Sequence, residues 1–128
     1  MRLALTLTGA HGELLVSPAG PADVKALAGS NVTLAVSFRG APDPAVTWFL
    51  GHLPVVTWTI GSTAPPDIAE HKKTVLWLEQ NGSLTFRNVS VGSTSNYTVE
   101  MTKSGLGTAS TAFTLRVFGE RGTELCMF

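Results

Sequence analysis

The stretch Ser95-Asn96-Tyr97-Thr98-Val99-Glu100-Met101 alternates polar with larger apolar side chains. Successive side chains of a β-strand point to opposite faces, so Tyr97, Val99 and Met101 would share one face of an extended segment. Alternation over this length is typical of a strand with one face in a core and the other exposed. The stretch therefore predicts a half-buried β-strand.

The same alternation recurs along the chain. It is found at residues 32–36, 46–48, 84–86 and 113–117. Gly, Pro, Asp and Asn cluster between these runs, as they do in turns, and the strand formers Val and Thr are abundant. Residues 68–78 are the nearest candidate for a helix, but 74–78 favour a strand. Many short strands at this spacing predict an all-β sandwich or barrel.

Four residues narrow the fold to an immunoglobulin-like sandwich. Such domains join strands B and F by a disulfide, pack a strand C tryptophan on it, and place a tyrosine two residues before the second cysteine. Here Trp48 and Tyr97 fit the two aromatic positions, and Val36 and Val99 stand where the cysteines would be. We expect these four residues in the core. Two valines fill much of the volume that the disulfide would occupy. By closing a loop in the unfolded chain, that disulfide would contribute about 4 kcal/mol to stability.

Length and charge limit the class of protein. The chain has 128 residues, zero formal net charge and 14% charged residues. One domain is expected, over residues 14–118, with 119–128 as a tail or linker and 1–13 as a signal remnant or a strand-like arm. Neutral charge argues against nucleic acid as a partner. No apolar run approaches the roughly 20 residues that span a bilayer.

The asparagines indicate secretion. The chain has four, and each begins an acceptor sequence for N-glycosylation. They are Asn31, Asn81, Asn88 and Asn96. Glycosylation requires an exposed site and a secretory route, so we expect an extracellular protein, secreted or held at the cell surface by an anchor outside this chain.

A family resemblance rests on four stretches, which are Val46–Gly51, Val56–Gly61, Asn81–Leu84 and Tyr97–Leu106. The chain resembles the N-terminal V-type domains of the carcinoembryonic-antigen-related cell adhesion molecules, and is similar to the first domain of the hepatocyte cell adhesion molecules. The resemblance covers roughly residues 14–118. Domains of these families lack the B–F disulfide. They bind proteins, often a copy of themselves, through the flat GFCC′C″ sheet face.

Strand parity transfers this face to the present chain. If Trp48, Tyr97 and Val99 point inward, their neighbours on the same strands point outward. The expected interface comprises Thr47, Phe49, Leu53, Val56, Thr98, Glu100, Thr102 and Leu106. The register around Leu53 and Val56 is open by one residue, and such a slip would exchange the faces. Phe49 is the strongest candidate because exposed aromatics are enriched at interface cores, although a neighbouring loop covering it is the alternative.

Other classes of function have less support. The three histidines are scattered and lack catalytic or metal-ligand spacing, so we expect no enzyme, no metal and no cofactor. The expected partner is a second copy or a related immunoglobulin-family protein. The alternatives are a heterophilic immune ligand or receptor domain, and a structural subunit of an extracellular assembly. The single cysteine, Cys126, is either a free tail thiol or a link between chains.

Overall fold

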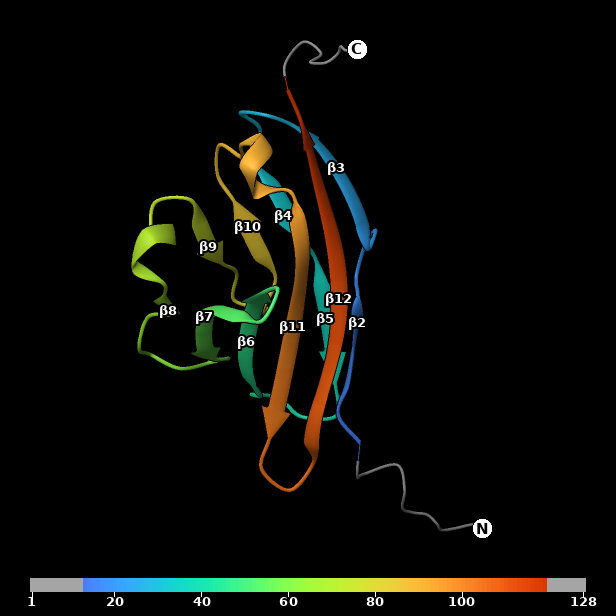
Figure 1. Cartoon of the computed structure of the whole chain (residues 1–128). Helices are drawn as coiled ribbons and strands as arrows, with labels where there is room; N and C mark the ends of the chain where they lie inside the picture. The colour runs from blue at the N-terminus through green and yellow to red at the C-terminus, as the bar shows by residue number, and fades with distance from the viewer. Residues whose placement is uncertain (1–12, 120–128) are drawn as a thin grey trace.

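The computed structural model describes residues 13–119, which form two packed layers of β-strands (Figure 1). In chain order the elements are β2 (Leu15–Pro18), β3 (Asp23–Leu27), β4 (Val32–Leu34), β5 (Val36–Arg39), β6 (Ala45–Leu50), β7 (Leu53–Thr59), β8 (Asp67–Ile68), the 3-10 helix η2 (Glu70–Lys72), β9 (Leu76–Leu78), β10 (Leu84–Phe86), the 3-10 helix η3 (Val91–Ser93), β11 (Ser95–Lys103) and β12 (Gly107–Phe118). The all-β architecture expected from the alternation is confirmed. The expected arm at 1–13 and the tail at 119–128, including Cys126, lie almost wholly outside the described residues.

The larger layer is a six-stranded sheet with the order β3-β12-β11-β6-β7-β8. Its strands pair antiparallel except β3, which runs parallel to β12 along the outer edge. In immunoglobulin nomenclature, β12, β11, β6, β7 and the two-residue β8 occupy the positions of strands G, F, C, C′ and C″.

The second layer joins β4, β10 and β9 in one sheet and β2 with β5 in a short pair beside it. The chain passes from one layer to the other between β2 and β3, through the sequence Ala19-Gly20-Pro21-Ala22. The Ala19 amide still donates to the Ala35 carbonyl of the second layer, at 2.8 Å, before the chain leaves it. One N-terminal segment therefore closes an edge of each layer, which limits unpaired strand edges.

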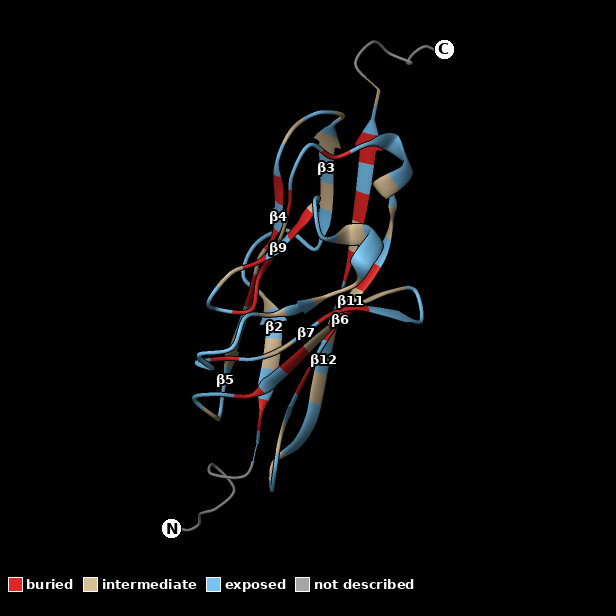
Figure 2. Cartoon of the chain, turned by 90° about the vertical axis from the view of Figure 1, so that its left-hand side faces the viewer, coloured by how far each residue is buried: buried red, intermediate tan, exposed pale blue. Residues whose placement is uncertain are grey.

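The core lies between the layers and is centred on Trp48. Figure 2 shows the buried residues along the inner sides of the strands. Trp48 is fully buried, its indole Nε1 donates to the Gly82 carbonyl at 2.8 Å, and its ring lies 5.5 Å from that of Phe113. Val36 and Val99 are also fully buried, as expected. Aromatic and aliphatic packing thus occupies the place where a disulfide would lie.

Tyr97 forms the corner that its sequence position predicts. Its hydroxyl donates to the Ser93 carbonyl at 2.8 Å, four residues upstream, and its ring meets the edge of Phe86 at 5.1 Å. This bond ties η3 to the start of β11, while Phe86 brings in the opposite layer. Tyr97 is 2% exposed and lies in the core cluster.

Burial raises the pKa of Tyr97 to about 12 from its ordinary value of 10.0. Because the chain has one tyrosine, tyrosinate absorbance reports this side chain alone. We expect a midpoint near pH 12 for the folded protein and near pH 10 in urea. A raised pKa means that the neutral hydroxyl stabilises the fold fully below pH 10, and that this contribution is lost as pH rises through 12. A midpoint near 10 in the native protein would contradict the buried corner.

The strand β9 carries a large aromatic side chain on its outer face. Leu76 and Leu78 point inward, and Trp77 between them points outward. Trp77 lies on the outer face of β9 and is 50% exposed. The Arg87 guanidinium stacks on its ring, 5.1 Å from the centroid, and gives this aromatic a partner outside the core.

Candidate protein-binding face

The outward side chains of the central strands of the larger sheet form a flat surface, here called the front face. Its members on β6, β7, β11 and β12 are Thr47, Phe49, Thr57, Thr59, Thr98, Glu100, Thr102, Thr108, Ser110 and Ala112. They are aligned by strand register into rows. One row runs Thr57, Thr47, Glu100 and Ser110, and the next contains Phe49, Thr98 and Ala112.

Seven hydroxyl side chains dominate the front face. Thr102 and Thr108 lie opposite each other at the end of β11 and β12, with their hydroxyl oxygens 2.9 Å apart. Threonine and serine lose little side-chain entropy when they are covered, compared with lysine or glutamate. Such a surface is favourable for close contact with another flat surface.

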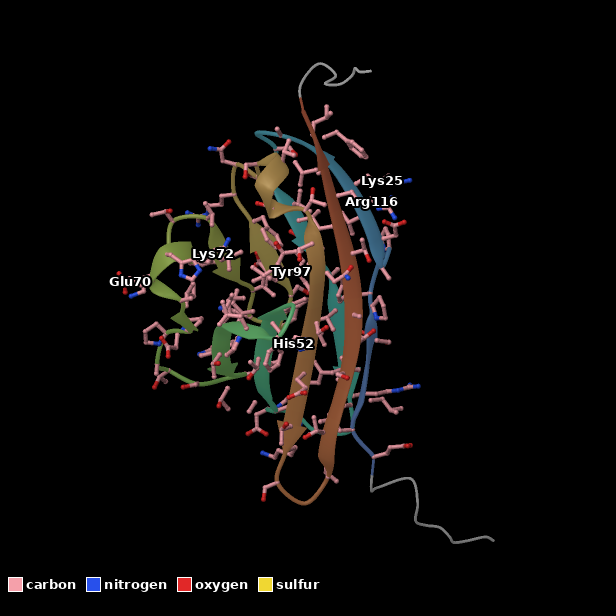
Figure 3. All side chains as sticks on the ribbon, in the orientation of Figure 1. Lys25, His52, Glu70, Lys72, Tyr97 and Arg116 are labelled. Carbon is pink, nitrogen blue, oxygen red and sulfur yellow. The ribbon has the colours of Figure 1, made fainter. Side chains whose placement is uncertain are left out.

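Phe49 lies at the edge of a shallow hollow in the front face. The hollow has a volume of about 280 Å³ and is lined by Phe49, Gly51, His52, Thr98 and Glu100. Phe49 is half-buried and does not belong to the core cluster. In Figure 3 the turn between β6 and β7, which carries His52, lies beside β11. The Gly51 amide fixes this position by donating to the Asn96 carbonyl of β11 at 3.2 Å.

Glu100 is the only charged member of the front face. The described residues contain three ion pairs, which are Lys73 with Glu70, Lys103 with Asp43, and Arg116 with Asp23. Glu100 takes part in none of them, although it is exposed at the centre of the sheet. Its carboxylate is therefore available to a hydrogen-bond donor or a cation from a partner.

The expectation that Val56 belongs to this face is wrong. Val56 is 1% exposed and pairs with the buried Trp48. A register shift between Trp48 and Phe49 places an extra residue in β7, so that Val55 and Val56 are both buried. Such a bulge interrupts strict alternation. Inward and outward positions on one side of it therefore cannot be assigned by counting from the other side.

Two other expected interface residues lie at the margins. Leu53, which opens β7, is 53% exposed and pairs with Leu50 beside the hollow. Leu106, in the turn between β11 and β12, is half-buried and packs against the core. Trp58 on β7 is partly buried and packs against the core, and its indole donates to the Ala64 carbonyl at 2.7 Å.

The four sequon asparagines are all exposed, but they lie on different surfaces. Asn81 and Asn88 flank β10 in the smaller sheet. The Asn31 side-chain oxygen accepts from the Asn88 amide at 3.0 Å, so these two sites are neighbours. Asn96 alone is in the larger sheet, on β11.

Sequence reasoning missed part of this surface. Thr108, Ser110 and Ala112 are outward on β12, and parity with the buried Phe113 would have identified them. His52 gave no such signal, because a turn residue has no strand parity. Among the residues that the structure describes, no group of three or more metal-ligating side chains comes together. Within that same part of the chain, no helix is long and apolar enough to cross a bilayer.

Comparison with known proteins agrees with the architecture. The profile of the immunoglobulin I-set domain matches residues 18–117. No curated protein sequence matches the chain significantly. The solved structures that resemble it include murine CEACAM1b, with a TM-score of 0.63 and 23% identity over 84% of this chain and 54% of that one.

Two further structures share the fold. The two tandem V-type regions of VCBP3, a v-region-containing chitin binding protein, give a TM-score of 0.73 at 14% identity, over 89% of this chain and 48% of theirs. One chain of the structure of Dpr1 IG1 bound to DIP-eta IG1 gives a TM-score of 0.64 at 11% identity, over 83% of this chain and 97% of that one. The chain spans about half the length of the CEACAM1b and VCBP3 structures.

These neighbours include V-type domains, in accord with the expected V-type sandwich and its resemblance to the carcinoembryonic-antigen-related molecules. The structure itself has three features that are typical of immunoglobulin domains. They are the corner tyrosine, the buried tryptophan and the strand order of the larger sheet. The chain therefore belongs to the immunoglobulin superfamily, in the I-set domain family.

Proposed function

We propose that this domain is an extracellular recognition module that binds a protein partner through the front face, and that the partner is a second copy of the same chain. The observation that carries the proposal is the half-buried Phe49 beside its hollow, on a sheet surface whose one charged side chain is Glu100. Aromatic side chains in such positions dominate the binding energy of protein interfaces.

Self-association is supported by the chemistry of the front face. Two copies related by a two-fold axis present the same surface to each other, so a face rich in like charges would repel itself. Here the charge is limited to Glu100, and its carboxylate can accept hydrogen bonds from the hydroxyls and His52 of the facing copy. Threonine and serine can both donate and accept, which makes the surface complementary to itself.

Phe49→Ala is expected to weaken self-association by about 2 kcal/mol, roughly 30-fold in the dissociation constant. Sedimentation equilibrium on the full chain, produced without glycans and with reductant present, measures this change. Reductant removes any contribution from Cys126.

Trp77→Ala is the matched control, since it removes an exposed aromatic from the outer face of the smaller sheet. It is expected to leave self-association unchanged. If Trp77→Ala weakened association and Phe49→Ala did not, the interface would lie on the smaller sheet, which would contradict the proposal. A wild-type protein that stays monomeric at millimolar concentration would reject homophilic binding.

A heterophilic partner is the second candidate, and Glu100 is the observation that favours it. An exposed carboxylate without an ion pair beside an aromatic ring is suited to an arginine or lysine of a different protein. The Dpr1 domain, solved with DIP-eta, is a similar domain in complex with another protein. Glu100→Gln separates the two cases, because it would weaken binding to a cationic partner strongly and self-association little.

A further inference from the structure

Asn96 is the one sequon asparagine that adjoins the hollow of the front face. It is exposed near the start of β11 and alternates with the buried Tyr97, so its side chain lies on the same side of the sheet as Thr98 and Glu100. Its backbone carbonyl accepts from the amide of Gly51, which lines the hollow. Asn96 therefore borders the hollow through both a neighbouring strand position and a direct hydrogen bond.

The side chain of Asn96 is held in place by its neighbours. Its Oδ1 accepts a hydrogen bond from the Thr114 hydroxyl on β12, at 3.2 Å. N-linked sugars attach to Nδ2, so this hydrogen bond is compatible with glycosylation. The bond holds the side-chain amide that would carry a glycan against the sheet, between β11 and β12.

The distance from this root to the hollow is short. Thr98 follows Asn96 by two positions, about 7 Å along the strand. It lines the hollow and pairs with Phe49 across the sheet. The first sugars of a branched glycan reach over such a distance, and their apolar faces can pack on an aromatic ring. Asn31, Asn81 and Asn88 belong to the surface of the other sheet, away from this hollow.

We propose that an N-glycan on Asn96 covers the Phe49 hollow and controls access to the front face. Chains with the glycan have a masked face, and chains without it have an open one. The masking itself depends only on the placement of Asn96. Its consequence for self-association rests on the function proposed above.

The test uses the full chain secreted from mammalian cells, as wild type, Asn96→Gln and Asn31→Gln. Glycopeptide mass spectrometry measures occupancy at Asn96. Diethyl pyrocarbonate modification, followed by peptide mapping, then measures the accessibility of His52, and sedimentation equilibrium measures self-association. Asn31→Gln is the matched control, because it removes a sequon on the other sheet. Thr98→Ala and Thr98→Ser form a second pair, and both retain Asn96. Thr98→Ala destroys the sequon, whereas Thr98→Ser keeps it.

We expect Asn96 to be occupied, and His52 to react several-fold faster in Asn96→Gln and Thr98→Ala than in wild type, Asn31→Gln or Thr98→Ser. Self-association of Asn96→Gln should be about tenfold tighter, as expected when a few central contacts become accessible. An unoccupied Asn96, or equal His52 reactivity in all forms, would overturn the proposal. If His52 is shielded by the glycan but no form self-associates, masking stands and homophilic binding fails.

Discussion

Trp48→Ala is expected to lower the free energy of unfolding by about 3–5 kcal/mol. The indole is completely buried between the two sheets and packs on Phe113. Its removal leaves a large cavity and deprives the buried Gly82 carbonyl of the Nε1 donor at 2.8 Å. A typical domain has a total stability of about 5–15 kcal/mol. Without a disulfide to limit the unfolded chain, this one substitution would remove much of that margin. Urea denaturation followed by circular dichroism measures the loss.

Trp77→Ala provides the comparison, because the same side chain is removed from a half-exposed position. It is expected to cost less than about 1 kcal/mol, mostly through the lost contact with Arg87. Trp48→Phe should fall between the two, since it keeps apolar volume but loses the hydrogen-bond donor. Equal losses for Trp48→Ala and Trp77→Ala would contradict a core centred on Trp48.

The double substitution Val36→Cys with Val99→Cys is expected to stabilise the oxidised protein by about 3–4 kcal/mol. Both valines are fully buried on the inner sides of opposite layers, beside Trp48. They occupy the positions that a disulfide joins in other immunoglobulin domains, and a bridge there would close a loop of about 60 residues. The gain comes mainly from the lower entropy of the cross-linked unfolded chain. Denaturation of oxidised and reduced samples measures it directly.

Cys126→Ser is included in every protein of this series so that only the new pair can form. The reduced double variant should be no more stable than the wild type, because cysteine fills less space than valine in the same pocket. Formation of the bridge without any gain, or a failure of the two thiols to pair, would mean that Val36 and Val99 do not face each other as they do in disulfide-linked domains.

Much of the fold could be predicted from the sequence because alternation reflects burial directly. Tyr97, Val99 and Met101 are buried as their spacing predicts, and so are Phe113 and Leu115. Each strand in question has one face against a core and one face in solvent, which gives a period of two.

Alternation does not locate residues whose position depends on how two strands pair or on the conformation of a turn. Val56 was placed on the outer face because the pairing of β7 with β6 could not be fixed from the sequence, and in the structure Val56 lies opposite the inward-facing Trp48. The contact of Trp77 with the guanidinium of Arg87, outside the core, is a second feature that alternation does not reveal. His52 reaches the candidate site only through the conformation of a turn, which the order of residues does not reveal.

Two copies of the chain are expected to meet through the front face. Nuclear magnetic resonance on the ¹⁵N-labelled, unglycosylated full chain tests it most directly, by following amide shifts from micromolar to millimolar concentration under reducing conditions. The expected result is a set of concentration-dependent shifts confined to β6, β11, β12 and the turn that carries His52, and absent in Phe49→Ala. Shifts confined to β4, β9 and β10, or no shift at any concentration, would contradict the claim.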